Sequence, residues 1–265
     1  RTPPTRAQGS PPTTSTMVRK NAVRLWAVVF WLVVWQLGSM AFGQTLLLPS
    51  PLAVLLRLAS LAATVEFWSA VGWSAARILG GFALSCLAAV LLAVPAFRWR
   101  RIQELLSPLV AAVKAVPVAS FIILALVWLN SRQLSLFIAE LMVFPTVYTN
   151  VLTGIGQTDP KLLEMARVFR VPLARQVTGI YLPAILPYFR AACSLSLGLC
   201  WKAGIAAEVI GLPSGSLGER LYTAKVYFQT EDLFAWTAVI VAVSLVFERL
   251  FLRAVNALAE RLGSL

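Results

Sequence analysis

The sequence predicts an all-α integral membrane protein with six transmembrane helices, and three observations lead to this prediction. Of the 265 residues, 59% are hydrophobic and only 13% are charged, about half the charged fraction of a typical soluble domain. Long segments carry no charge, as between Arg24 and Arg57 and between Arg77 and Arg98. The basic residues lie mainly at the ends of the apolar segments, where they orient a membrane protein.

Each predicted span is an apolar segment of about 20 residues, the length that crosses the hydrocarbon core of a bilayer. Lys114 interrupts the third segment, and Glu140 lies near the start of the fourth. Residues 50–68 contain Arg57 and Glu66 and are predicted to form an amphipathic helix at the membrane surface. The six spans cover residues 25–42, 78–97, 105–129, 134–152, 184–205 and 233–252.

The distribution of charge predicts that both termini lie in the cytoplasm, because cytoplasmic loops carry an excess of Lys and Arg. With six spans, all four strongly basic regions fall on one side, whereas five or seven spans would separate them. The opposite loops carry Arg57 with Glu66, a lone Arg132, and mixed charges from Glu208 to Asp232. The basic regions are Arg19, Lys20 and Arg24; Arg98, Arg100 and Arg101; Lys161, Arg167, Arg170 and Arg175; and Arg249, Arg253 and Arg261.

The chain divides into a short tail and one membrane domain. Residues 1–16 are rich in Pro, Thr and Ser, and such a segment cannot bury an apolar core. We therefore predict a disordered N-terminal tail over residues 1–18 and a transmembrane domain over residues 19–265.

Several classes of function are excluded by the composition. A net charge of +12 would suggest nucleic-acid binding in a soluble chain, but these charges lie at span ends, so no nucleic-acid partner is predicted. The chain has no histidine, and Cys86, Cys193 and Cys200 lie inside apolar segments, which predicts no metal site. The acids within the spans are single, so no intramembrane catalytic site is predicted. The nucleotide-binding motif G-x-x-x-x-G-K-[ST] is missing, which predicts that the chain does not itself hydrolyse ATP.

A short charged helix is predicted between the fourth and fifth spans. Asp159 is a good N-cap, and Pro160 fits the first helical position. The helix can continue over residues 161–169, and Val171-Pro172 ends it because a residue before proline disfavours the helical region. Two interpretations stay open on these grounds: a surface helix whose arginines contact anionic lipid, or a rigid docking element for a cytoplasmic partner.

The same segment resembles the EAA loop of ABC importer permeases. The pattern of that loop is E-A-A, three residues, G, nine residues, and I-x-L-P. Here Glu164-Met165-Ala166 is followed at the same spacing by Arg170 and by Ile180-Tyr181-Leu182-Pro183. Met165 is a mild departure. Arg170 replaces a glycine that would allow a positive-φ turn, so it predicts a different turn or an added charge contact with the partner.

Four further segments resemble the nitrate, sulfonate and taurine branch of these permeases. They are "LLLPSPLAVLLRL" after the first span, "SAARILGGFAL" at the start of the second, "AVKAVPVASF" in the third, and "AAEVIG" at the end of the fifth. With the EAA-like loop they make five motifs in the family order over most of the chain after residue 25, which chance does not explain.

The resemblance implies a type I ABC importer permease fold in the plasma membrane, with no cofactor bound by this chain. The implied partners are a cytoplasmic ATPase dimer that binds ATP and Mg, an extracytoplasmic solute-binding protein, a second permease copy and the lipid bilayer. The binding protein is expected to dock on residues 211–234. Coupling to the ATPase is assigned to residues 158–183, and among them to Glu164, Met165, Ala166, Phe169, Arg170, Ile180, Leu182 and Pro183.

Two prolines follow the EAA-like loop. Pro183 and Pro187 have no backbone N–H and limit how the fifth span begins. Two interpretations stay open: they mark a helix boundary, or they make the start of the span a stiff, bent lever that carries motion out of the loop.

The translocation path is expected among the charged residues within the spans, because these usually face a bundle interior or water. The candidates are Lys114, Lys202 and Glu208, together with Trp201 next to Lys202, and the two lysines are expected to face an anion. The implied solute is a small organic or inorganic anion of the sulfonate, nitrate or taurine kind. Two alternatives stay open: import of a pyrimidine, thiamine-precursor or other small solute, and a channel or scaffold that needs no ATPase.

Overall fold

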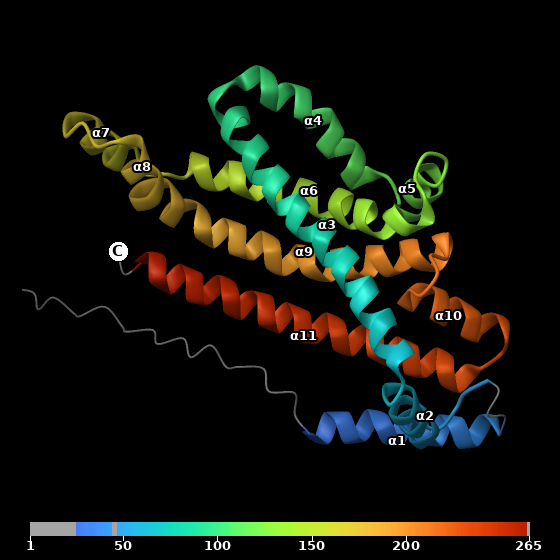
Figure 1. The fold of residues 1–265 in the computed structure, drawn as a ribbon. Helices are drawn as coiled ribbons and strands as arrows, with labels where there is room; N and C mark the ends of the chain where they lie inside the picture. The colour runs from blue at the N-terminus through green and yellow to red at the C-terminus, as the bar shows by residue number, and fades with distance from the viewer. Residues whose placement is uncertain (1–24, 44–46, 264–265) are drawn as a thin grey trace, which may run out of the picture.

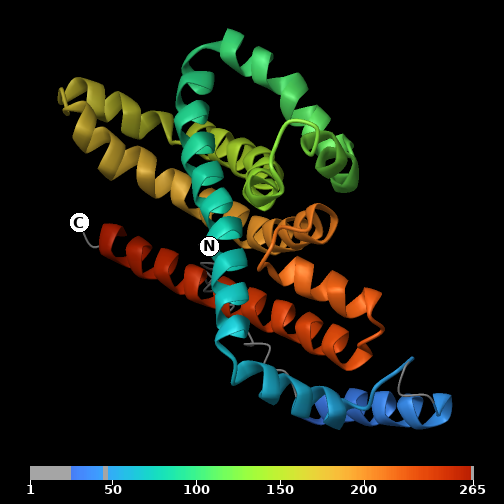
Figure 2. The same ribbon diagram turned by 45° about the vertical axis from the view of Figure 1, so that its right-hand side comes forward.

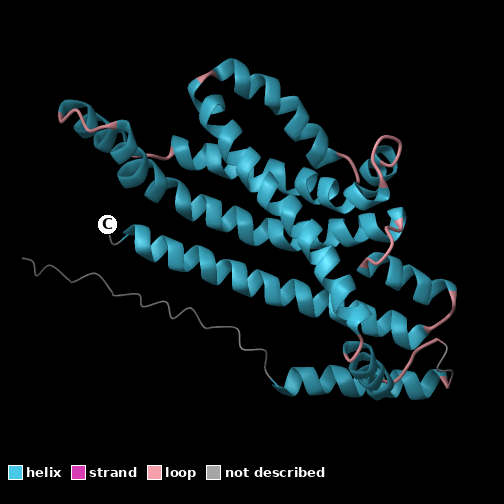
Figure 3. Ribbon diagram, viewed as in Figure 1, coloured by secondary structure: helices cyan, strands magenta, loops and turns pink. Residues whose placement is uncertain are grey.

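The structure is a computed structural model that describes residues 25–43 and 47–263. Every regular element in this part of the chain is a helix (Figures 1 and 3). The tail predicted over residues 1–18 lies outside the described residues. The elements are α1 (Leu25–Phe42), α2 (Pro51–Ala62), α3 (Val65–Arg98), α4 (Arg100–Ala115), α5 (Val118–Ala125), α6 (Ser131–Gly156), α7 (Pro160–Val168), α8 (Leu173–Gln176), the π-helical turn η1 (Val177–Tyr181), α9 (Leu182–Gly211), α10 (Leu217–Val226) and α11 (Thr230–Gly263).

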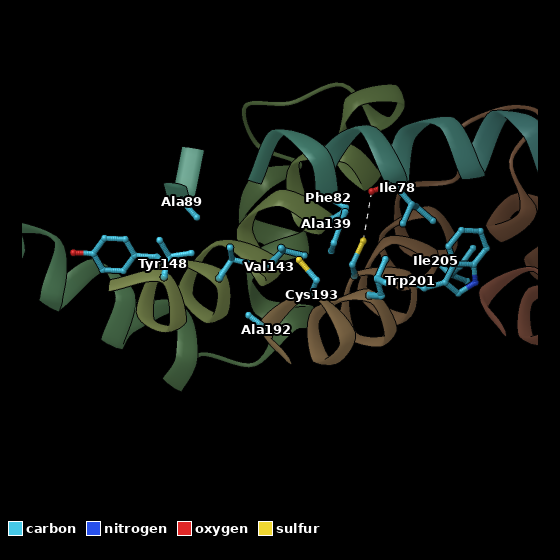
Figure 4. Close-up of a cluster of buried hydrophobic side chains, with 14 of the residues drawn as sticks. Ile78, Phe82, Ala89, Ala139, Val143, Tyr148, Ala192, Cys193, Trp201 and Ile205 are labelled. Atoms are coloured by element: carbon cyan, nitrogen blue, oxygen red, sulfur yellow. Dashed lines mark hydrogen bonds between the residues drawn. The ribbon is translucent and has the colours of Figure 1, made fainter. Parts of the chain in front are cut away.

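The core lies where three long helices meet. α6 and α9 lie side by side, and α3 crosses them (Figures 1 and 2). Their side chains form the main buried cluster, which includes Ile78, Val143 and Trp201 (Figure 4). The bundle has two ends: one holds α7, the α3–α4 connection and the C-terminal end of α11, and the other holds α5 and α10 (Figure 1).

A glycine sets how closely α3 and α6 approach each other. A Cβ atom at Gly81 would collide with the carbonyl oxygen of Leu136 and would lie 2.9 Å from the Cβ atom of Ala139. A larger residue would therefore push the two helix backbones apart, as at other close crossings in membrane proteins. Gly81 lies in the "SAARILGGFAL" segment, so this position of the motif has a packing role.

Three helices among the described residues are long and apolar enough to cross a membrane, or four if a bent pair counts as one span. The three are α3, α6 and the continuous helix Leu173–Gly211, and the bent pair is α4 with α5. α1 has the predicted bounds, but it is grouped with the shorter apolar helices. The count of six spans therefore stays a prediction.

The third predicted span, residues 105–129, is wrong as a single straight helix. α4 and α5 meet at an angle of 107°. Val116, between them, has an extended backbone with φ −83° and ψ 134°. Pro117 causes the break, because a proline disfavours the helical region for the preceding residue and lacks the N–H that would continue α4.

The predicted surface helix over residues 50–68 is also corrected, because it is two elements. α2 ends at Ala62, and Thr64 caps α3 through its Oγ1, which accepts from the N–H of Phe67 at 3.3 Å. A threonine N-cap starts a new helix, so residues 65–68 belong to α3. α3 consequently has 34 residues and begins well before the predicted span 78–97.

Candidate functional site

The short charged helix predicted between the fourth and fifth spans is α7. Asp159 is its N-cap, and its Oδ1 accepts from the N–H of Lys161 at 2.9 Å. Pro160 occupies the first turn, where a backbone N–H would have no acceptor within the helix, so the lack of one in proline costs no hydrogen bond. α7 lies at the tip of the bundle, beyond the ends of α6 and α9 (Figure 1). The start and length of this helix are confirmed.

The end of α7 keeps the turn that a glycine would make. The N–H of Val171 donates to the carbonyl oxygen of Ala166 at 2.8 Å, and the N–H of Arg170 donates to that of Arg167 at 3.2 Å. This is the Schellman pattern, which needs a left-handed residue after the helix. Arg170 has φ 51°, so the expectation of a different turn is wrong.

Four of the eight predicted coupling residues are exposed on α7 and the turn that follows it. Glu164, Met165 and Arg170 are exposed, and Phe169 is exposed over 75% of its surface. Val168, next to it, is 77% exposed, whereas Ala166 is fully buried. Exposed large apolar side chains beside charged ones mark a surface that binds a partner.

The I-x-L-P part of the motif lies within a helix and does not begin one. α8, η1 and α9 form one continuous helix from Leu173 to Gly211, which excludes a helix boundary at Pro183. At the π-helical turn the N–H of Leu182 donates to the carbonyl oxygen of Val177, one residue further back than in an α-helix. Ile180 and Leu182 are half-buried, and Pro183 is exposed.

The four path candidates separate into two exposed and two buried side chains. Lys114, in the last turn of α4, and Lys202, on α9, are exposed on the single chain. Trp201 is buried in the core (Figure 4), and its indole N–H donates to the carbonyl oxygen of Ile240 at 3.0 Å. Glu208 is 0% exposed. A path role for Trp201 or Glu208 is therefore not supported by their placement within one chain.

Glu208 joins two segments that the family resemblance singled out. Its Oε2 accepts from Ser74 Oγ at 2.7 Å and from the backbone N–H of Gly218 at 3.2 Å. Ser74 belongs to "SAARILGGFAL" and Glu208 to "AAEVIG", so two motifs far apart in the sequence meet in one buried contact. Sequence reasoning did not connect these residues, because nothing in a single sequence reports a contact between distant segments.

Two ion pairs lie at the same end of the bundle as α10. Arg57 of α2 pairs with Asp232 of α11, and its Nη2 donates to Oδ2 at 2.9 Å. The hydrogen bond to Asp232 raises the pKa of the Arg57 guanidinium. Arg220 of α10 pairs with Glu66 of α3 at 3.0 Å. Within the described ranges, no group of three or more His, Cys, Asp or Glu side chains could hold a metal ion.

The fold is all-helical, with several helices long and apolar enough to cross a membrane and an exposed helix at one tip. Together with the family match, these features define a membrane transport subunit. A family model described as "Binding-protein-dependent transport system inner membrane component" matches residues 81–263. The chain belongs to this family. It is thus an inner-membrane permease of an ABC transporter, and the ATPase of such a system is a separate subunit.

Known relatives agree with this assignment, and one solved structure shares the fold. The chain is 29% identical to the putative aliphatic sulfonates transport permease protein SsuC of Bacillus subtilis, over 77% of this chain and 74% of the relative. It is 30% identical to SsuC of Escherichia coli over 82% and 84%, and 26% identical to the taurine transport system permease protein TauC of that organism over 84% and 82%. A crystal structure of an amino acid ABC transporter with histidines has a similar fold, with a TM-score of 0.51 and 17% identity over 72% of this chain and 90% of that one.

Proposed function

We propose that the chain is a six-span permease subunit of an ATP-driven importer and that α7 couples it to the ATPase. The proposal rests on the structure and position of α7. It is a short helix capped at both ends, fixed between α6 and the continuous helix Leu173–Gly211, and it exposes Glu164, Met165 and Phe169 at the tip of the bundle. Such a helix fits a groove in a partner and transmits the partner's motion to two spans.

The charge distribution supports placing the α7 end in the cytoplasm. The α3–α4 connection carries Arg98, Arg100 and Arg101, and it lies at the same end as α7 and the C-terminal end of α11 (Figure 1). Positive charge gathers on the cytoplasmic side of membrane proteins. We therefore call the opposite end, with α5 and α10, the outer end. The six proposed spans are α1, α3, the α4–α5 pair, α6, α8 to α9, and α11.

The names of the relatives support a small anion as the solute. Two of them are described as permeases for aliphatic sulfonates and one as a permease for taurine, and both kinds of solute carry a sulfonate group. Lys114 and Lys202 are exposed on a single chain, so both can face a path that forms between two permease copies. We propose these two lysines as the groups that attract the anion.

The proposed partners follow from the family. A binding-protein-dependent system needs an ATPase dimer, which binds ATP and Mg, and an extracytoplasmic binding protein. We propose that a second copy of this permease completes the path. The binding protein would dock at the outer end on residues 211–234, most of which form α10 and the start of α11.

The coupling role is tested by co-purification of the ATPase with a Glu164→Arg variant. Glu164 is exposed, so the variant should fold, and loss of the co-purified ATPase is expected. Glu104→Arg is the matched control, because Glu104 is also exposed at the α7 end of the bundle but lies outside the coupling loop. ATPase binding and transport at wild-type levels in Glu164→Arg would contradict the proposal.

A further inference from the structure

The outer end of α9 holds a carboxylate that is fully shielded from solvent. Glu208 is 0% exposed, and a buried carboxylate is costly unless other groups compensate its charge. Its Oε2 accepts one hydrogen bond from Ser74 of α3 and one from Gly218 of α10. Arg77 of α3, whose guanidinium lies 3.4 Å from the centre of the Trp73 ring, also attracts it electrostatically. Glu208 therefore ties three elements together.

The start of α10 is built around this carboxylate. The N–H of Leu217 donates to Ser74 Oγ at 2.9 Å, and the next N–H, that of Gly218, donates to Glu208. Ser216 caps the helix within its own segment by accepting from the N–H of Glu219 at 3.0 Å. Helix N-termini favour negative charge. Two of the first N–H groups of α10 are thus satisfied by side chains of other helices.

The backbone of α10 also touches α9 directly. A Cβ atom at Gly218 would collide with the Cβ atom of Glu208 and would lie 2.6 Å from both its carbonyl carbon and the nitrogen of Val209. Any side chain at this position would displace α10 from α9. The absence of a side chain at Gly218 is what allows the hydrogen bond to the carboxylate to form.

One oxygen of the carboxylate stays unused in this arrangement. Ser135 of α6 lies close to the carboxylate, yet neither Ser135 Oγ nor Glu208 Oε1 has a hydrogen-bond partner among the described residues. The hydrogen bonds of the Glu208 carboxylate are therefore all with α3 and α10. If α10 moved away, the carboxylate would lose the donor at Gly218 and the helix N-terminus, and would keep only the hydrogen bond from Ser74.

We propose that Glu208 is a positioning residue of the transport cycle. It holds α10 closed over the outer ends of α3 and α9, and opening of the outer end requires α10 to separate from this carboxylate. The inference rests on the proposed function for the meaning of the outer end and for the transport cycle. The hydrogen bonds and the steric contact at Gly218 are independent of it.

The separation of α10 can be followed with a cysteine reporter. Ala224 of α10 is 3% exposed, so an Ala224→Cys variant, with Cys86, Cys193 and Cys200 replaced by alanine, reports opening as reaction with a maleimide. The rate is measured on the full permease–ATPase complex in lipid nanodiscs, where both faces are accessible. Glu208→Gln should raise the rate about tenfold or more, since it weakens hydrogen bonds to a charged group.

A second carboxylate that contacts α10 provides the matched control. Glu66 pairs with Arg220 of α10, but its side chain is 77% exposed, and exposed ion pairs contribute little. Glu66→Gln should change the labelling rate by less than about twofold. Ser74→Ala should also raise the labelling rate. Because Ser74 and Glu208 act in one contact, the fold-increase in the Ser74→Ala/Glu208→Gln double variant should be smaller than the product of the two single fold-increases.

Two further measurements separate positioning from general damage. Gly218→Ala keeps the carboxylate but displaces α10, so it should label as fast as Glu208→Gln. In both variants ATP hydrolysis without binding protein should rise toward the stimulated rate, whereas a damaged fold would lower both rates. Wild-type labelling in Glu208→Gln and Gly218→Ala, or an equal rise in Glu66→Gln, would overturn the inference. The labelling assay does not depend on α7. Failure of the inference about Glu208 can therefore be distinguished from failure of the coupling proposal, which is tested by ATPase binding in Glu164→Arg.

Discussion

The backbone N–H of Val171 donates to the carbonyl oxygen of Ala166 at 2.8 Å, and this bond closes α7 with Arg170 in the left-handed region. A side chain with a Cβ atom costs about 1–2 kcal/mol there relative to a residue that tolerates positive φ. The chain therefore keeps the geometry of the loop at some cost in local stability.

Replacing Arg170 by glycine should raise stability. Glycine adopts φ 51° without the Cβ penalty, so Arg170→Gly should increase the free energy of unfolding of the loop by about 1 kcal/mol. Thermal unfolding of the purified complex measures this. Arg170→Val is the control and should lower stability, because a β-branched residue is strained at positive φ. A lower unfolding temperature in Arg170→Gly would contradict the account of this turn.

Two glycines of α3 should respond in opposite ways to alanine. Gly81→Ala forces a Cβ atom against the carbonyl oxygen of Leu136 and should cost about 1–3 kcal/mol. Gly72→Ala places its Cβ atom in open space and should be neutral or stabilise the helix by up to about 1 kcal/mol. Unfolding temperatures in the same detergent compare the two variants. Equal effects would show that the α3–α6 crossing does not depend on backbone contact.

Phe169→Ala should weaken binding of the ATPase without unfolding the permease. The ring is 75% exposed, so its removal should change stability by less than about 0.5 kcal/mol. A large apolar side chain at the centre of a protein interface is often a hot spot, and about tenfold loss of affinity is expected. Trp99→Ala is the control, because Trp99 is also exposed at this end of the bundle but is outside the coupling loop. Similar losses in both variants would contradict a specific role for Phe169.

The neighbours Trp201 and Lys202 should give different phenotypes. Trp201→Phe removes the N–H that donates to Ile240 and should cost about 1 kcal/mol of stability, with the transport KM unchanged once the protein is folded. A changed KM at full stability would instead place the indole on the path.

Lys202→Gln should show the reverse pattern. The lysine is exposed on the single chain, so stability should change little, and a sulfonate solute should be transported with a higher KM because a favourable charge is lost. Transport kinetics in proteoliposomes with the loaded binding protein measure this, with Arg101→Gln of α4 as a control at an exposed basic residue outside the path and docking segments. An unchanged KM in Lys202→Gln would remove this residue from the proposed path.

Sequence reasoning predicted local features more completely than long-range ones. The N-cap at Asp159, the length of α7 and the bounds of α1 follow from residues that are adjacent in the sequence, and they are confirmed. The break at Pro117 could also be predicted from a proline within an apolar segment, but counting spans by hydropathy alone did not include it. The start of α3 was missed for a similar reason, since Thr64 lies inside a segment with helical periodicity.

The contacts between distant residues could not be predicted in the same way. Glu208 was singled out because a charge in a span is unusual. Its partners Ser74 and Gly218 are small residues of common types, and their identity alone does not mark them as partners of a carboxylate. Trp201 was placed near the path because it is adjacent to Lys202 in the sequence, whereas the packing of α9 against α11 buries it. Helix crossings decide these positions, and a single sequence does not report them.

The uninterrupted helix Leu173–Gly211 has a consequence for how signals could pass through the protein. Its 39 residues span about 60 Å at the usual rise per residue, with the end of the coupling motif near one terminus and Glu208 near the other. Because the helix is continuous, a displacement at either end is transmitted to the other end. Thermodynamic reciprocity then requires that whatever a docked binding protein does to nucleotide affinity, bound nucleotide does in equal measure to the affinity for the binding protein.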